Sequence, residues 1–232
     1  MYQEIKILYE DSGFLIVCKP SGIAVHHTDG MPHDEPVLLS ILGKQLNISL
    51  YNVHRLDAKT SGLIVVAKDQ DSAKILTSMF ESRRVEKEYL ALVRGTPPKI
   101  GEFNSTVQNK AKGKQVSAIT RFEVMETYQT NISYKSFENI PLSLVRIEPQ
   151  TGRWHQIRQH FAYHRFDILG DNHHGDRMLN HIVESISGVK RLYLHASRLR
   201  FVHPKTNETI ELQCQLPDEF QTTIQKCISF TP

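Results

Sequence analysis

The sequence predicts an α+β fold with a mixed, mostly antiparallel sheet flanked by helices. Short apolar runs separated by turn residues recur along the chain, as in residues 5–9 and 14–18, which form a predicted hairpin around residues 10–13. Between such runs lie a few longer segments with apolar residues at helical spacing. The chain has 232 residues, 40% of them hydrophobic, enough for one large domain or two small lobes.

The expected strands, about eight or nine in number, are runs that alternate apolar with polar residues or are rich in branched side chains. They cover residues 5–9, 14–18, 63–67, 87–93, 103–108, 116–125, 142–147, 191–201 and 209–215. In the run at 87–93, Tyr89 shares one face with Ala91 and Val93.

Four segments predict helices, and they cover residues 37–45, 69–84, 154–161 and 217–228. In the third, Trp154, Ile157 and Phe161 are spaced to face the core. Arg158 borders that buried face. Because an unpaired buried charge is costly, Arg158 is expected to have an anionic partner.

Composition places limits on the class of protein. The formal net charge of +3 is compatible with nucleic acid as a partner but does not establish one. The three cysteines are odd in number and far apart, which argues against a disulfide and favours a reducing compartment. No segment approaches the roughly 20 apolar residues that span a bilayer, and the start lacks a signal-peptide pattern. We expect a cytoplasmic monomer.

Two loops, at residues 26–36 and 170–177, are rich in His, Asp and Gly. Neither contains a recognised metal-binding spacing, so we interpret them as hydrogen-bonded loops and expect no metal. The alternative from another class is a metal-dependent hydrolase that uses His26, His27, His173 and His174, with Asp29 and His33 near the first pair.

One stretch, residues 54–68, places a carboxylate and an arginine at a tight turn that runs straight into a branched apolar strand. Asp57 lies at this junction of loop and core, where a side chain is well held yet reachable. In an earlier turn, Pro20 biases Lys19 toward extended geometry, so Lys19 is either held in place or an ordinary solvated lysine. The densest basic patch, either a solvated tip or a phosphate contact, holds Lys110, Lys112 and Lys114.

The sequence His54-Arg55-Leu56-Asp57, followed by Thr60-Ser61-Gly62, resembles the signature of the RluA family of pseudouridine synthases. Other motifs similar to the family's follow its order over most of the chain: Lys19-Pro20-x-Gly22, Lys87-x-Tyr89, Thr151-Gly152-Arg153-x-His155-Gln156-Ile157-Arg158, Gly170-Asp171 and Leu194-His195-Ala196. The extended loop at 170–176 and the start directly at the catalytic domain, without an S4 RNA-binding domain, resemble the TruC branch, which modifies a uridine in tRNA.

The resemblance implies the pseudouridine synthase fold, with a central sheet of two lobes and a catalytic cleft across the sheet. It implies a single catalytic domain over residues 1–232. The reaction would break the N1–C1′ bond of a uridine, rotate the base and join C5 to C1′, with no cofactor. The branch points to uridine 65 in the T stem of tRNA, and the alternative substrate is 23S rRNA or several RNAs.

The resemblance also implies roles for individual residues. Asp57 would be the catalytic carboxylate, paired with Arg158, which would orient it and keep it ionised. Tyr89 would stack on the uracil and accept the C5 proton. Leu194 would close the apolar wall of the pocket, and Arg55 would fill the gap left by the flipped base.

The other candidate substrate-binding residues are His54, Lys19 and Arg153. His54 is expected to support the loop before Asp57. Lys19 and Arg153 are candidates for phosphate contacts, which would make RNA binding sensitive to salt.

Overall fold

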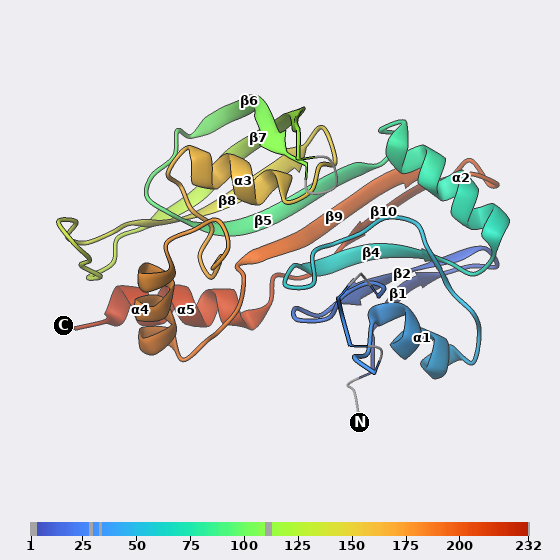
Figure 1. Ribbon diagram of the computed structural model, residues 1–232, viewed down its shortest axis with the longest axis horizontal. Coiled ribbons are helices and arrows are strands. Elements are labelled where there is room, and N and C mark those ends of the chain that lie inside the picture. The colour runs from blue at the N-terminus through green and yellow to red at the C-terminus, as the bar shows by residue number, and fades with distance from the viewer. Residues whose placement is uncertain (1–3, 28–29, 33, 110–112, 232) are drawn as a thin grey trace. The chain divides into compact units, whose positions relative to one another are not determined.

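The structure is a computed structural model that describes residues 4–27, 30–32, 34–109 and 113–231 (Figure 1). The chain divides into two compact units. The first holds residues 1–87 and 196–214, and the second holds residues 88–195 and 215–232. The described residues form ten strands and five helices, which confirms the α+β class and adds one or two strands and one helix to the expected sets.

The sheet strands of the first unit are β1 (Ile7–Glu10), β2 (Phe14–Lys19), β3 (Tyr51–Asn52), β4 (Ser61–Ala67), β9 (Leu194–Val202), which enters this unit at Ala196, and β10 (Thr209–Gln213). Their order is β1-β2-β4-β9, with β3 beside β4 and β10 beside β9. The pairs β1–β2, β2–β4, β3–β4 and β9–β10 are antiparallel. The first hairpin is therefore as predicted, whereas the two-residue strand β3 was not.

Two helices belong to the first unit, α1 (Leu38–Leu46) and α2 (Gln70–Glu81). Asp69 caps α2, because its carboxylate accepts a hydrogen bond from the backbone N–H of Ser72 at 2.7 Å. Leu76 and Met79 of this helix are buried in a core that also contains Leu63 and Val65 of β4. One face of β4 and the apolar stripe of α2 thus bury each other.

The second unit contains β5 (Glu86–Arg94), which enters from the first unit, and β6 (Ile100–Gln108), β7 (Gln115–Tyr128) and β8 (Leu142–Pro149). Their order is β5-β8-β7-β6, and all three neighbouring pairs are antiparallel. Helix α3 (Gln156–Tyr163) packs on β6, β7 and β8, as Figure 1 shows. Ile157 and Phe161 are buried as predicted, but Trp154 lies in the turn before the helix.

Helix α4 (Arg177–Ser187) was not predicted from the sequence, which we interpreted as a polar turn up to residue 177. The carboxylate of Asp176 caps it by accepting from the backbone N–H groups of Met178 at 3.0 Å and Leu179 at 3.2 Å. Gly188 ends it with a φ of 73°, a left-handed conformation that suits glycine. Helix α4 packs beside α5 (Asp218–Ser229), which matches the expected C-terminal helix.

Cys18 and Cys214 are joined by a disulfide within the first unit. The expectation of unpaired cysteines is wrong for these two. They are separated by 196 residues in sequence, and strands β2 and β10 place them together only in the folded chain. Cys227 is a buried free thiol in the second unit.

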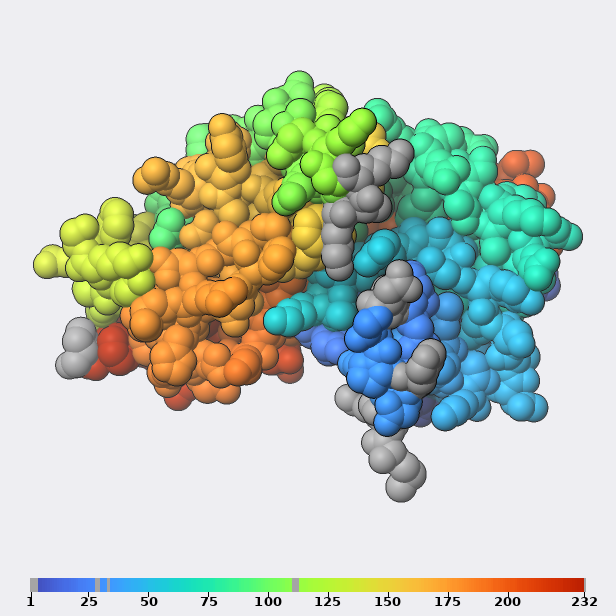
Figure 2. All heavy atoms as spheres, viewed as in Figure 1, coloured from blue at the N-terminus to red at the C-terminus, as the bar shows by residue number. Residues whose placement is uncertain are grey.

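Residues 131–139 form a largely exposed loop of the second unit, shown in yellow-green in Figure 2. Of the predicted basic patch, only Lys114 lies within the described residues, and it is exposed. Lys110 and Lys112 lie outside them, as do Asp29 and His33. Among the helices that the structure describes, none is long and apolar enough to cross a membrane.

Candidate active site

Asp57 begins a tight turn in the first unit. The turn spans residues 57–60 and is closed by a hydrogen bond from the N–H of Thr60 to the carbonyl oxygen of Asp57 at 3.0 Å. The Asp57 side chain is half-buried, as expected for a group at the junction of loop and core. Strand β4 starts immediately afterwards at Ser61, two residues before the start of the expected strand at 63–67.

Gly62 is required by a close approach between backbones. A Cβ atom at this position would lie 2.2 Å from the carbonyl oxygen of Ala196, and the φ of Gly62 is +113°. Any side chain would therefore push β4 away from β9 within the first unit. The glycine fixes where the strand that follows Asp57 lies.

Lys19 holds the Asp57 turn from inside the protein. Its side chain is completely buried, and its ammonium group donates to the carbonyl oxygens of Pro20 at 2.9 Å, Ile23 at 2.8 Å and Ala58 at 2.9 Å. The N–H of Gly22 donates to the same Ala58 oxygen at 2.9 Å. This geometry does not fit the predicted phosphate contact, because a buried ammonium with three backbone acceptors is not presented to RNA. Lys19 is instead a clamp on the residue next to Asp57.

His54 is fixed within the protein. Its Nε2 accepts a hydrogen bond from the N–H of Val65 at 3.0 Å, and its ring stacks on Phe80 with centroids 4.0 Å apart. Burial, assisted by the charge of Lys87, lowers the pKa of His54 to about 3. A neutral, stacked imidazole fits the expected supporting role. Arg55, next in sequence, is exposed and can reach a ligand.

Arg158 is buried in the second unit, and its anionic partner there is Asp171. The guanidinium donates from Nε to Oδ2 at 2.7 Å and from Nη2 to Oδ1 at 2.8 Å, a bidentate ion pair. Nη1 contacts Nε2 of His155 at 2.8 Å. The side chains of Arg158 and Asp171 are only 7% and 2% exposed, so solvent screens this pair weakly.

Asp171 is a residue whose role the sequence did not reveal. Burial alone would raise its pKa, but the hydrogen bonds and charge of Arg158, with the N–H groups of His173 and His174, lower it to about 2. The signal in the sequence was the Gly170-Asp171 motif, interpreted as part of a loop. The first position of the motif requires a glycine, since a Cβ atom at residue 170 would lie 1.6 Å from the carbonyl oxygen of Arg191.

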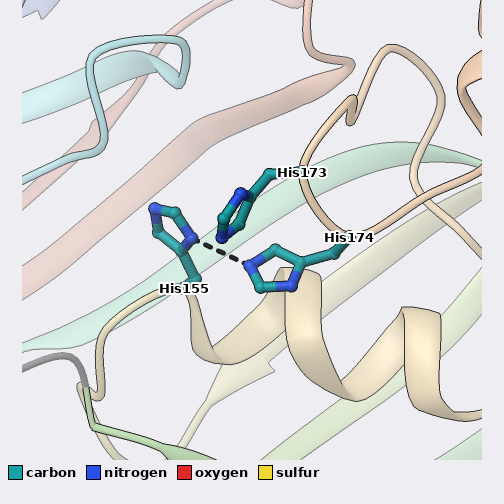
Figure 3. A group of neighbouring side chains, drawn as sticks. All are labelled: His155, His173 and His174. Atoms are coloured by element: carbon teal, nitrogen blue, oxygen red, sulfur yellow. Dashed lines mark hydrogen bonds between the residues drawn. The ribbon is translucent and has the colours of Figure 1, made fainter.

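Three histidines of the second unit converge, as Figure 3 shows: one ring nitrogen from each of His155, His173 and His174 lies within 4.8 Å of the others. This spacing would suit a tetrahedral metal ion. The hydrogen bonds of His155, however, do not fit metal binding. Arg158 can only donate, so Nε2 of His155 accepts and the ring proton is on Nδ1. That Nδ1–H points at Nε2 of His174 at 2.9 Å. The donor nitrogen that a metal would need therefore carries a proton.

The start of α3 is anchored by Gln156, another role that sequence reasoning missed. Its buried amide donates to the carbonyl oxygen of Ile119 and the hydroxyl of Thr120, both at 2.9 Å. Its oxygen accepts from the hydroxyl of Thr151 at 2.6 Å. This fastens the helix that carries Arg158 to β7. Arg153, in the turn before the helix, is exposed and can contact a phosphate.

The remaining candidates lie on strands of the second unit. Tyr89 is on β5, half-buried against the core and opposite Ile147 of β8. Leu194 begins β9 and is buried in the same core. Asp57 belongs to the first unit and Arg158 to the second, so their predicted contact stays a prediction.

Comparison with known proteins identifies the class. Residues 13–163 match the model of the RNA pseudouridylate synthase family, and the chain therefore belongs to that family. A relative from Vibrio parahaemolyticus, tRNA pseudouridine synthase C, is 33% identical over 228 residues, covering 94% of this chain and 93% of its own. A protein of the same name from Haemophilus ducreyi is 32% identical with the same coverage.

Two solved structures share the fold. Human RNA Pseudouridylate Synthase Domain Containing 4 superposes with a TM-score of 0.73 and 26% identity, covering 95% of this chain and 92% of that one. Human RNA Pseudouridylate Synthase Domain Containing 1 gives a TM-score of 0.75 and 25% identity, with 97% and 87% covered. The predicted pseudouridine synthase fold is thus confirmed.

Proposed function

We propose that this chain converts a specific uridine of tRNA to pseudouridine. The observation that carries the proposal is Asp57, held on a turn clamped by Lys19, in a chain of this family. Similarity to tRNA pseudouridine synthase C extends over nearly the full length of both chains, which supports tRNA as the substrate class. Within tRNA we propose uridine 65 of the T stem, and we propose that the enzyme acts as a cytoplasmic monomer without a metal.

Asp57 begins the reaction, either by attacking C1′ of the ribose or by helping to deprotonate the sugar. Both routes need an ionised carboxylate that is held in place. A guanidinium has five N–H donors, and the bonds to Asp171 and His155 use three of those of Arg158. A bidentate contact with Asp57 uses two more, so the donor set of Arg158 is sufficient for both carboxylates.

Tyr89 and Leu194 form the base pocket in this proposal. A half-buried tyrosine on a rigid strand can stack on uracil and, through its hydroxyl, take the C5 proton at the end of the reaction. Leu194 supplies apolar surface next to the base. No external group is consumed, since the base is released and rejoined within one nucleotide.

A uridine in a paired stem must leave the stack, which costs a few kcal/mol unless the gap is filled. Arg55 is exposed two residues before Asp57, and its planar guanidinium can stack and hydrogen-bond in the vacated position. Arg153 and Lys114, both exposed, provide phosphate contacts.

The experiment is pseudouridine mapping on tRNA after incubation with the purified protein. We expect one modified position with the native chain and none with Asp57→Ala or Asp57→Asn, while tRNA binding persists. Tyr89→Phe should retain binding and slow the release of product from the intermediate. Pseudouridine formation by Asp57→Ala at an appreciable rate would remove Asp57 from the chemistry.

Ribosomal RNA is the second candidate substrate. Ribosomal large subunit pseudouridine synthase C of Buchnera aphidicola is 36% identical over 227 residues, covering 96% of this chain and 71% of its own. Mapping RNA from cells that lack the protein separates the two substrates. Loss of a pseudouridine in 23S rRNA with unchanged tRNA would favour ribosomal RNA as the substrate.

A further inference from the structure

Arg158 belongs to a closed ring of hydrogen bonds within the second unit. The Asp171 carboxylate accepts from Arg158 and from the backbone N–H of His174 at 3.1 Å. The His174 side chain contacts His155 at 2.9 Å, and His155 returns to Nη1 of Arg158 at 2.8 Å. We call these four residues the Arg158 ring.

Arg158 donates at both ends of the ring, and Asp171 accepts at both ends. Arg158 donates to Nε2 of His155, whose Nδ1–H donates to Nε2 of His174. Both imidazoles must be neutral for this, and burial lowers the pKa of His155 to about 3 and that of His174 to about 4. The charged groups that act on the pair are Arg158 and Asp171, with His173 beside them.

The backbone at His155 has a sparsely populated conformation. His155 adopts a left-handed conformation, with φ 49° and ψ 26°, immediately before α3. A residue with a Cβ atom rarely occupies this region, and such a conformation persists where surrounding contacts impose it. Trp154 stacks on the His155 ring with centroids 3.9 Å apart and restricts its rotation. These contacts together aim Nε2 at Arg158.

We propose that His155 and His174 are positioning residues for Arg158: His155 holds the Nη1 side of the guanidinium while Asp171 holds its Nε and Nη2 side. The guanidinium then has one orientation in which to meet a second carboxylate. This rests on the proposed function in that the second carboxylate is Asp57. Neither histidine touches the substrate in this role, so replacing them changes the rate of reaction and not the affinity for RNA.

Matched variants test the role kinetically. His155→Phe keeps a flat ring against Trp154 but removes the acceptor, and His155→Gln keeps an acceptor near the position of Nε2. With tRNA in single-turnover reactions, we expect His155→Phe to react roughly tenfold to a hundredfold more slowly at saturating RNA, with an unchanged dissociation constant. His155→Gln should recover most of the rate, and His174→Phe should resemble His155→Phe.

His173→Ala is the control, because the His173 ring packs against those of His155 and His174, with centroids 5.5 Å and 4.4 Å away, while the hydrogen bonds of the Arg158 ring run through His155 and His174. It should react at the native rate. The proposal is overturned if His155→Phe reacts at the native rate, if His155→Gln is as slow as His155→Phe, or if the loss lies wholly in RNA affinity. Equal loss in His173→Ala together with a stoichiometric bound metal would also overturn it.

A second measurement does not depend on activity. Nitrogen-15 NMR of the arginine side chains reports rotation about the Cζ–Nη1 bond of Arg158 in the RNA-free protein. We expect the same slow rotation in the native chain and in His173→Ala, and faster rotation in His155→Phe, which has lost one of the contacts to Nη1. An equal rotation rate in all three proteins would refute the positioning role. If the native protein modifies no RNA, the proposed function fails, yet this measurement still decides whether His155 holds Arg158.

Discussion

The ammonium group of Lys19 donates to the carbonyl oxygen of Ala58, the residue that follows Asp57, at 2.9 Å. It also donates to two more carbonyl oxygens, those of Pro20 at 2.9 Å and Ile23 at 2.8 Å. The Asp57 turn is thus stabilised by a group that was expected to bind RNA.

The clamp role of Lys19 predicts a particular response to salt. Lys19→Met should lower the stability and the reaction rate, because it leaves three carbonyl oxygens without their shared donor. It should not change the slope of log K against log salt for RNA binding, since no phosphate contact is lost. Arg153→Ala should reduce that slope by about one unit. If Lys19→Met reduced the slope of log K against log salt, Lys19 would contact a phosphate after all.

The buried pair of Arg158 and Asp171 predicts a large effect on stability. Asp171→Asn removes the bidentate anionic partner of a buried guanidinium, and breaking such a pair destabilises a protein by about 3–5 kcal/mol. Denaturant unfolding measures this change. Lys74 and Asp71 form an exposed pair, so Asp71→Asn is the matched control, with an expected effect within about 1 kcal/mol. Similar values for both variants would mean that burial adds nothing to the Arg158–Asp171 pair.

Neutral histidines predict that the protein is less stable in acid. The pKa of His54 is about 3 in the folded chain, against an ordinary value of about 6.5, so the unfolded chain takes up the proton first. The contribution of His54 is therefore complete above pH 6.5 and is lost as the pH falls from there toward 3. At pH 5 the loss is about 2 kcal/mol.

Melting temperatures at pH 7.5 and pH 5 provide the measurement. His54→Gln keeps an acceptor for the Val65 N–H without titrating, and should narrow the difference between the two temperatures. The exposed His181 provides the control substitution, His181→Asn. If the difference between the two melting temperatures were the same in His54→Gln as in the native chain, His54 would not take up a proton on unfolding.

Much of the fold could be predicted, because the spacing of apolar residues along the chain indicates which side chains are buried. The hairpin at the start, the strand after Asp57 and the helix that carries Arg158 follow from local apolar patterns. Helix α4 had a readable signal that was missed: Asp176 before it, Gly188 after it, and apolar residues at helical spacing between them. Strand β3, with two residues, is too short to carry a periodic pattern.

The site was predictable only as far as residue types and motifs allow. Motifs indicated Asp57, Arg158 and the Gly170-Asp171 pair as important, but no local pattern shows that Asp171 lies beside Arg158, 13 residues away across a loop. The burial of Lys19 was equally hidden, since a lysine in a turn has the same sequence appearance whether it faces water or carbonyl oxygens. Contacts between residues far apart in the chain depend on the whole fold, so local sequence patterns do not predict them.

The disulfide between Cys18 and Cys214 predicts a count of thiols. Protein purified and denatured without reductant should expose one reactive thiol, that of Cys227, whose pKa burial raises to about 11 in the folded chain. With reductant the count should be three.

Reduction should also lower the melting temperature, because the bridge closes a loop of 196 residues in the unfolded chain and typically contributes about 2–5 kcal/mol. Cys18→Ser with Cys214→Ser should remove this response to reductant, whereas Cys227→Ser should keep it. Three reactive thiols in unreduced protein would show that the two cysteines are unbridged under the conditions of purification.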